Sequence, residues 1–313
     1  MAEAPAGGIL GNASCRDQPC VEISLPQGDR VCIALHGAHV LSWQTADGKE
    51  QLFLSSAAKF DGVSPIRGGV PVCFPQFNQR TLGGQPLPKH GFARTQPWTV
   101  LAIEQTDTRA QARLQLCSND TTRAIWPHEF AVILTVQLDP GHLHVSFEVQ
   151  NTGPQSWLFA LALHTYLQVD DISQTCLQGL QGLAYWDAVQ NLKQPDIRQT
   201  QPLDGAAGAL AFKAETDRVY EGVHHKADAT LQLQHAGASV QISQSSSLSE
   251  IVVWNPGAAL SASIPDLPND GYRYMLCVEA ACINTPVTLA VGQRWSGWQS
   301  LQVLDERAVR STV

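Results

Sequence analysis

The stretch Tyr274-Met275-Leu276-Cys277-Val278-Glu279-Ala280-Ala281-Cys282-Ile283 is largely apolar on both faces of an extended chain. A strand of this kind is typical of a sheet that is covered on both sides. Glu279 is the only charged residue in it, and burying an unpaired carboxylate costs several kcal/mol or forces it to keep its proton. Three explanations are open for Glu279: it belongs to a functional site, it pairs with a buried arginine, or it lines a solvated rim.

A second apolar run, Trp157 to Leu163, ends at a single imidazole, His164. With alternating side chains, His164 shares a face with small apolar residues and with Tyr166, so this face turns polar at the end of the strand. That pattern fits the mouth of a pocket. It fits equally well a core histidine whose ring N–H is satisfied by a backbone carbonyl.

Many other short runs alternate or are continuously apolar, and Gly, Pro, Asn and Asp separate them. Long helical periodicity is nearly absent, so the sequence predicts an all-β fold, a large sandwich of antiparallel sheets. The predicted strands are Val31 to Trp43, Leu101 to Leu116, Phe130 to Leu138, His142 to Asn151, Trp157 to Val169, Leu231 to Ser243, Ile251 to Trp254, Tyr274 to Ile283, Val287 to Leu289 and Trp298 to Leu304, with a polar loop region from Gln190 to Ala211.

Composition limits the function classes. The chain has 313 residues, of which 44% are hydrophobic and 15% charged, and its net charge is −8. This acidity argues against a nucleic-acid partner, and no apolar run is long enough for a membrane span. We expect a flexible tail over residues 1–18 and one domain over residues 19–313. Because the chain starts without a signal-like segment, we expect a cytoplasmic protein whose eight cysteines are mostly free thiols.

No metal site is predicted. A zinc site needs three or four Cys and His ligands, and the cysteines and histidines of this sequence show no such spacing.

The segment from residue 62 to residue 98 departs from the strand pattern and is rich in Gly, Pro and basic groups. It holds Arg67, Lys89, His90 and Arg94 beside turns that Gly and Pro make tight. In an acidic chain such a group could form an anion pocket, since arginine presents a fork of donors suited to phosphate oxygens. A loop with surface salt bridges is the alternative.

Several motifs together resemble the aldose 1-epimerase (mutarotase) superfamily and, within it, the hexose-6-phosphate epimerases. Each motif is weak alone, but they occur in the family's order over most of the chain. They are Pro65-Ile66-Arg67-Gly68-Gly69, His90-Gly91-Phe92-Ala93-Arg94, Leu163-His164-Thr165-Tyr166, Thr216-Asp217-Arg218-Val219-Tyr220, Val253-Trp254-Asn255-Pro256-Gly257 and Cys277-Val278-Glu279. The resemblance implies a galactose-mutarotase-like β-supersandwich.

The resemblance also implies catalytic roles. Glu279 would be the general base that takes the proton of the anomeric hydroxyl, and His164 the acid that protonates the ring oxygen. His90 would assist at the ring oxygen, and Asp217 would accept hydrogen bonds from ring hydroxyls. The expected reaction is interconversion of the α and β anomers of hexose 6-phosphates, chiefly glucose 6-phosphate, without a cofactor and by a monomer.

The remaining implied contacts concern substrate binding. Arg67 and Arg94 would hold the 6-phosphate, and Lys89 would add to them. Gln76, Tyr166 and Asn255 contact sugar hydroxyls, support residues that do, or only shape the loops.

Three other functions compete with this hypothesis. The fold could serve a non-catalytic module that binds or senses sugar phosphates, since fold alone does not secure activity. It could also act on unphosphorylated aldoses. A glycosidase or lyase needs a second catalytic carboxylate, for which Asp217 is the only candidate.

Overall fold

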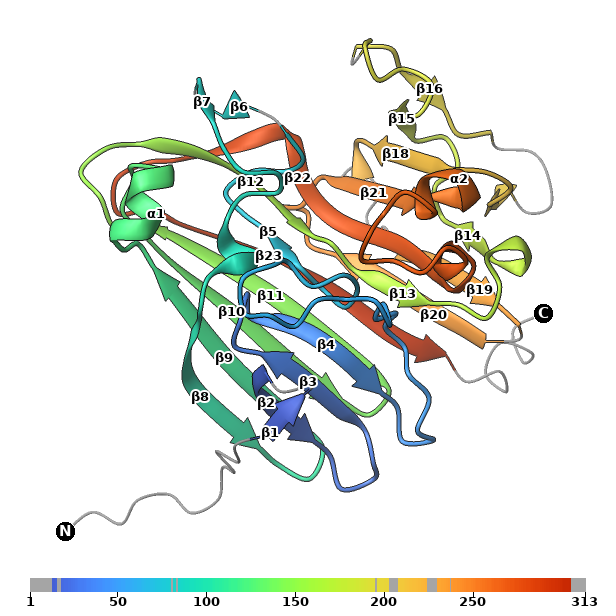
Figure 1. Ribbon diagram of the computed structural model, residues 1–313, viewed down its shortest axis with the longest axis horizontal. Coiled ribbons are helices and arrows are strands. Elements are labelled where there is room, and N and C mark those ends of the chain that lie inside the picture. Colours follow the sequence, from blue (N-terminus) through green and yellow to red (C-terminus); the bar gives the residue numbers. More distant parts are fainter. Residues whose placement is uncertain are drawn as a thin grey trace.

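The computed structural model describes residues 13–15, 18–79, 81–82, 84–194, 196–202, 208–223, 230–236 and 238–304. In these residues the chain forms antiparallel sheets (Figure 1), which confirms the predicted all-β class. The helical segments are short: α1 (Asp120–Ile125), α2 (Gly257–Ser261) and single 3₁₀ turns at Ala93–Thr95, Ile172–Gln174 and Gly271–Tyr274. None of the described helices has the length and apolar character of a membrane span.

The larger sheet has nine strands. Their spatial order is β17 (Leu210–Ala211), β14 (Cys176–Gln178), β19 (Thr230–His235), β20 (Ala238–Gln244), β23 (Arg294–Leu304), β11 (His142–Asn151), β10 (Phe130–Asp139), β9 (Ala110–Cys117) and β8 (Thr99–Gln105). The C-terminal strand β23 thus lies between β20 and β11, near the middle of the sheet.

The second sheet has eight strands and carries the site described below. Its order is β16 (Gln199–Thr200), β15 (Ala184–Asp187), β18 (Thr216–Tyr220), β21 (Glu250–Asn255), β22 (Met275–Leu289), β12 (Trp157–Leu163) and β5 (Val72–Cys73), and β13 (Tyr166–Gln168) also pairs with β22. A four-stranded sheet contains β1 (Ala13–Cys15), β2 (Gln18–Ser24), β3 (Arg30–Ala34) and β4 (His39–Gln44), and β6 (Thr81–Leu82) pairs with β7 (Gln85–Pro86).

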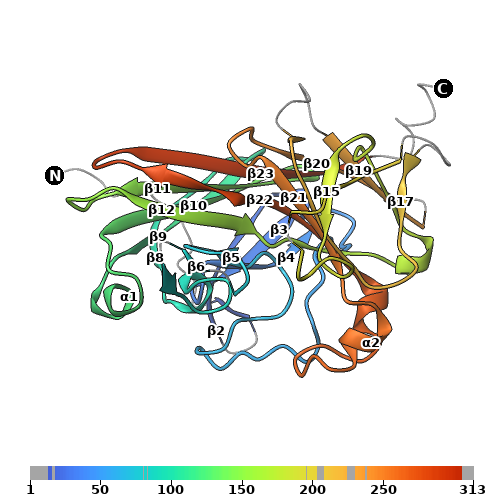
Figure 2. The same cartoon turned by 90° about the horizontal axis from the view of Figure 1, so that it is seen from above.

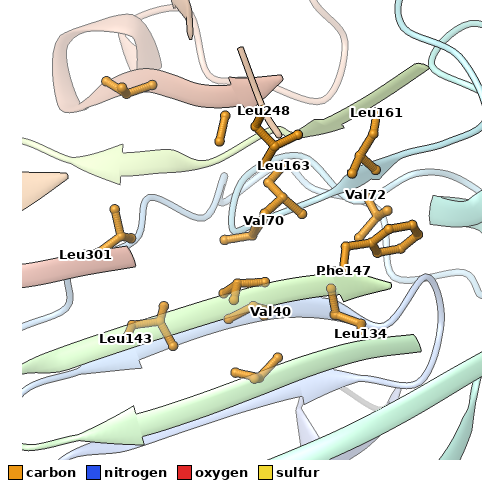
Figure 3. Packing of buried hydrophobic residues seen from close by; sticks show 14 of the residues in the cluster. Val40, Val70, Val72, Leu134, Leu143, Phe147, Leu161, Leu163, Leu248 and Leu301 are labelled. Atoms are coloured by element: carbon orange, nitrogen blue, oxygen red, sulfur yellow. The ribbon is translucent and has the colours of Figure 1, made fainter. Parts of the chain in front are cut away.

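One hydrophobic cluster joins these three large sheets. Figure 3 shows Val72 of β5 between Leu161 of β12 and Phe147 of β11, and Val40 of β4 near Leu134 and Leu143 of the larger sheet. The sheets overlie one another when the molecule is turned (Figure 2). Removing this apolar surface from water is the main term that holds the layers together, at about 25 cal/mol per Å².

The burial pattern of each strand follows its sequence. Residues of β11 alternate strictly between half-buried and buried, as expected for a strand with one face on the core. In β22, by contrast, every residue from Met275 to Ile283 is buried. The stretch around Glu279 is therefore a central strand covered on both faces, as its sequence predicts.

Strand boundaries differ from the prediction in several places. Three predicted strands, Val31–Trp43, Leu101–Leu116 and Leu231–Ser243, are each divided into the two antiparallel strands of a hairpin, β3–β4, β8–β9 and β19–β20.

The predicted strand Trp157–Val169 is interrupted after Leu163, where the backbone N–H of Thr165 turns back to the carbonyl oxygen of Leu163 at 2.9 Å. The N–H of His164 still bonds to Pro71 O, next to β5, at 3.0 Å. The two runs predicted near the C-terminus form one strand, β22, that continues through Pro286. Several strands were not predicted, and β16 and β17 lie within the predicted loop region. The unpredicted strands are β2, β5, β6, β7, β14, β15 and β18.

The predicted tail contains a short strand. β1 pairs with β2 through Ala13–Cys15, and residues 1–12 and 16–17 lie outside the described residues. The domain boundary at residue 19 stays a prediction.

Candidate active site

Sheet register brings His164 and Glu279 together. β12 and β22 are antiparallel neighbours in which Leu163 pairs with Ala280. The residue after Leu163, His164, therefore lies opposite Glu279. His164 Nε2 lies 3.5 Å from Glu279 Oε1. Two residues far apart in the sequence thus form one buried carboxylate–imidazole pair.

Glu279 is 1% exposed. Its Oε2 has no hydrogen-bond partner among the described residues. Burial raises the pKa of this carboxyl well above its ordinary value, and the nearby Asp217 adds to the shift. A carboxyl group with a raised pKa is suited to exchanging protons near neutral pH.

The imidazole of His164 is buried against the ring of Tyr166. The two rings are stacked, with centroids 4.8 Å apart and planes inclined by 9°. Burial lowers the pKa of His164 well below its ordinary value, and the cations Arg67 and Arg94 lower it further. Its Nδ1 has no partner in the described part of the chain.

His90 reaches the same place from a loop, with its ring centroid 5.5 Å from that of His164. The backbone N–H of Asn78 donates to His90 Nδ1 at 3.3 Å, and Cys73 Sγ lies 3.4 Å from the same nitrogen. Because burial, with His164 as a further cause, lowers the pKa of His90 well below its ordinary value, the ring is neutral. Since Nδ1 accepts from Asn78, Nε2 carries the hydrogen.

The turn at His90 requires a glycine. His90 and Gly91 have left-handed backbone angles, with φ of 63° and 69°. A Cβ on Gly91 would lie 2.1 Å from the carbonyl oxygen of Phe74. The glycine lets the loop approach Phe74 closely, and this approach fixes the position of His90.

Arg67, Lys89 and Arg94 lie together beside this pair and line one cavity. Arg67 Nε and Nη2 each lie 3.1 Å from Asp266 Oδ1, and Arg67 Nη1 donates to Tyr166 Oη at 3.0 Å. Arg94 Nη2 donates to the carbonyl oxygen of Lys89 at 2.8 Å. Arg94 Nε is buried without a partner among the described residues.

Two cavities adjoin at the site. The larger, of about 230 Å³, is lined by Arg67, Phe77, Asn78, Lys89, His90, His164, Asp217, Val252, Trp254, Leu260, Ile264 and Glu279. The smaller, of about 90 Å³, is lined by Pro65, Ile66, Arg67, Pro71, Lys89, His90, Arg94, His164, Tyr166 and Asp266. Shared residues make them one cleft, with the carboxyl groups of Glu279 and Asp217 in the larger part and all three cations along the smaller one.

Most predicted site residues lie in this cleft. Those that line it are His90, His164, Glu279, Arg67, Arg94, Lys89, Asp217 and Tyr166. Gln76 and Asn255 do not belong to either lining. Gln76 Nε2 donates to the carbonyl groups of Asn78, Leu87 and Pro88, and so holds the loop beneath His90.

Asn255 supports the backbone rather than the cleft. Its Nδ2 donates to Tyr272 O and Met275 O, each at 2.8 Å, and its Oδ1 accepts from the backbone N–H of Gly257. Of the two readings left open for Gln76 and Asn255, the contacts favour loop shaping.

Sequence reasoning missed Asp266, the ion-pair partner of Arg67, and the aromatic wall formed by Phe77 and Trp254. Trp254 precedes Asn255 in one of the family motifs, and its place in that motif could have marked it as a site residue. Asp266 lies alone in a loop, where nothing in the sequence marks it.

One group of potential metal ligands occurs in the described residues. His164, Cys277 and Glu279 bring one ligand atom each within 4.8 Å of one another. Cys277 also packs with Tyr166 and Met275 in an apolar cluster, and we assign no metal here. The expectation of no metal and no cofactor stays a prediction.

A sandwich of antiparallel sheets with a carboxyl group and an imidazole facing one cleft is the framework of an acid–base enzyme acting on a small molecule. The family model described as Aldose 1-epimerase matches residues 19–302. The chain therefore belongs to the aldose 1-epimerase family, as its motifs indicate.

Two named relatives are similar to this chain over most of their length. A relative from Cenchrus ciliaris is 35% identical over 283 residues, which cover 87% of this chain and 81% of that protein. A relative from Salmonella typhimurium is 32% identical over 281 residues, which cover 89% and 88%. Each bears the name "Putative glucose-6-phosphate 1-epimerase".

A crystal structure described as "a putative mutarotase (YeaD) from Salmonella typhimurium" superposes with a TM-score of 0.78 and 29% identity, covering 91% of this chain and 90% of that one. This match confirms the predicted mutarotase-like fold.

Proposed function

We propose that this protein interconverts the α and β anomers of hexose 6-phosphates, chiefly glucose 6-phosphate. The observation that supports this most directly is the junction of two different environments in one cleft. A carboxyl–imidazole pair faces the larger cavity, and three cations line the smaller cavity beside it. The names of the two relatives agree with this substrate.

The reaction is a proton exchange at two oxygens. Glu279 takes the proton from the anomeric hydroxyl while His164 gives a proton to the ring oxygen, and the bond between C1 and the ring oxygen breaks. The open aldehyde rotates about its C1–C2 bond. His164 then takes back the ring-oxygen proton as that oxygen attacks C1 from the other face, and Glu279 returns a proton to the new anomeric oxygen.

Two neighbours support these transfers. His90 Nε2–H donates a hydrogen bond toward the ring oxygen, because its Nδ1 is already engaged by Asn78. Asp217, in the wall of the larger cavity, accepts hydrogen bonds from ring hydroxyls. Arg67, Arg94 and Lys89 hold the phosphate, whose charge is about −1.5 to −2 near neutral pH.

Two related functions are weaker. A non-catalytic sugar-phosphate module has no need for the close pair of His164 and Glu279. An epimerase of unphosphorylated aldoses has no need for three cations on one side of its cleft.

Exchange NMR between the two anomers of glucose 6-phosphate tests the proposal, with glucose as the second substrate. Glu279→Gln is expected to lower the exchange rate by about 10²-fold or more. Glu104→Gln, on the exposed surface of β8, is the matched control and is expected to keep full activity. Wild-type protein that accelerates neither sugar would favour the binding module, and equal acceleration of both sugars would favour an unphosphorylated substrate.

The expectations of a cytoplasmic monomer also belong to this proposal. Light scattering coupled to size-exclusion chromatography is expected to give a mass near 33.9 kDa, and a value twice as large would contradict the monomer.

A further inference from the structure

His164 stands at the junction of the two cavities, whereas Glu279 lines only the larger one. All three cations line the smaller cavity beside His164, where Asp266 pairs with Arg67, and two of them, Arg67 and Lys89, also reach the larger cavity. Asp217 lies on the Glu279 side. Positive charge therefore lies mainly beside His164, and the negative charge of Asp217 lies beside Glu279.

This asymmetry opposes the protonation state that ring opening needs. The first step requires Glu279 without its proton and His164 with one. Nearby cations disfavour an imidazolium, and a nearby carboxylate disfavours a second carboxylate. Burial disfavours both charges. Without substrate, the single proton that the pair shares, hereafter the mobile proton, is therefore expected on Glu279. In that state Glu279 cannot accept a proton and His164 cannot donate one.

Tyr166 connects Arg67 to His164. Arg67 Nη1 is hydrogen-bonded to Tyr166 Oη at 3.0 Å, and the Tyr166 ring is stacked on His164. His90, a neutral ring, also packs edge-on against His164. The imidazole thus contacts neutral rings in a buried place, where charges are weakly screened.

We propose that the phosphate group of the substrate, once held by Arg67, Lys89 and Arg94, moves the mobile proton from Glu279 to His164. It follows that a free oxyanion in the same cavity activates the protein toward unphosphorylated glucose. This inference rests on the function proposed above and makes the phosphate part of the chemistry as well as of binding.

The size of the effect follows from charge. Asp266 already offsets the charge of Arg67, so a phosphate dianion offsets most of the positive charge that remains near His164. An opposite charge within a few ångströms changes a proton equilibrium by roughly one to three pKa units. Each unit is a factor of ten. Activation of glucose exchange by bound oxyanion is therefore expected to be roughly tenfold or more.

The first experiment supplies the substrate in two pieces. Anomer exchange of saturating glucose is measured with phosphite dianion, and with chloride at the same ionic strength. Phosphite is expected to accelerate exchange and chloride to have no effect. Phosphite that competes with glucose 6-phosphate but leaves glucose exchange unchanged would overturn the inference while leaving the proposed function intact. Failure to exchange glucose 6-phosphate itself would overturn the proposed function.

Arg94→Gln gives a second, opposite signal. It removes one cation from the His164 side, so exchange of glucose without oxyanion is expected to rise while activation by phosphite falls. A merely structural role for Arg94 would lower both rates together, and that result would contradict the proposal.

The mobile proton can also be located directly. Protein labelled with ¹⁵N-histidine is bound to 1,5-anhydroglucitol or to its 6-phosphate, neither of which can open its ring. The His164 signals, assigned by comparison with His164→Asn, are expected to report a neutral ring with the first ligand and an imidazolium with the second. A neutral ring with both ligands would refute the proton shift.

Discussion

The ring of Tyr166 lies flat against the imidazole of His164 while its hydroxyl accepts a hydrogen bond from Arg67. One side chain thus contacts both the proposed acid and the proposed phosphate ligand. The stacked ring fixes the plane of the imidazole, and the hydroxyl fixes one arm of the guanidinium. Anchoring of the phosphate and orientation of the acid therefore depend on the same residue.

Replacing Arg67 by Met is expected to raise KM for glucose 6-phosphate by about ten- to a hundredfold, because a hydrogen bond to a charged group contributes about 1.5–3 kcal/mol. The variant also leaves Asp266, whose side chain is 17% exposed, without its cation, so some loss of stability accompanies the change. Steady-state kinetics and urea unfolding measure the two effects.

Arg109→Met is the matched control for this substitution. It breaks a surface ion pair with Asp139, in which the arginine is 57% exposed, and such pairs contribute at most about 1 kcal/mol. An unchanged KM in Arg67→Met would exclude Arg67 from phosphate binding.

Gly91→Ala is expected to destabilise the protein and to reduce activity. Its new Cβ would meet the Phe74 carbonyl at 2.1 Å, so the turn that carries His90 has to move. Gly141→Ala is the comparison, since Gly141 has a similar φ of 63° but open space around its Cβ position. Both variants carry left-handed strain of about 1–2 kcal/mol, and urea unfolding is expected to show a larger loss for Gly91→Ala. Equal losses would mean that the close approach has no role.

Stability is expected to fall in mild acid because of His39. Burial lowers the pKa of His39 to about 4, whereas a histidine in the unfolded chain titrates near 6.5. As the pH falls from about 6.5 to about 4, the unfolded chain gains a proton that the folded protein does not take up. The resulting loss is about 3 kcal/mol, and it is complete below the lower value.

Urea unfolding at several pH values checks this slope. His39→Gln keeps a donor for the Gly68 carbonyl, which His39 Nε2 contacts at 2.7 Å, and is expected to flatten the pH dependence. The buried His90 and His164 also have lowered pKa values, so part of the slope remains. A variant with the same slope as the wild type would show that His39 does not contribute.

Chelation is expected to leave the activity unchanged, because proton transfer between Glu279, His164 and the sugar requires no metal. Anomer exchange is measured before and after dialysis against EDTA. A loss that Zn²⁺ restores would contradict this, and would direct attention to Cys277, which lies close to both residues.

The strands were predictable because hydrophobic periodicity is a local property of the sequence. Glu279 was conspicuous for the same reason, as the one charge in an apolar run. The break after Leu163 was not predictable, since the backbone N–H groups of His164 and Tyr166 find their acceptors at Pro71 and Gly69, which are remote in the sequence.

The continuation of β22 is also set by distant contacts. The buried carboxylate of Glu250 accepts hydrogen bonds from the backbone N–H groups of Ile283, Asn284 and Thr285. Polar residues that look like a turn in the sequence are therefore held within a strand. Asp266 was missed for a similar reason, because its importance comes from Arg67, which is remote in the sequence.

The proposed acid directly follows β12 and the proposed base lies within the neighbouring strand β22. The three cations, by contrast, come from loops and from the single 3₁₀ turn at Ala93–Thr95. A strand tolerates little change, since a slip by one residue would turn its side chains to the other face. Loops tolerate substitution and changes of length. The residues of proton transfer are thus fixed by strand geometry, whereas most of the residues that would bind the phosphate lie in segments that can be exchanged. Grafting of other loops therefore offers a route to epimerases for other sugar esters without rebuilding the pair of His164 and Glu279.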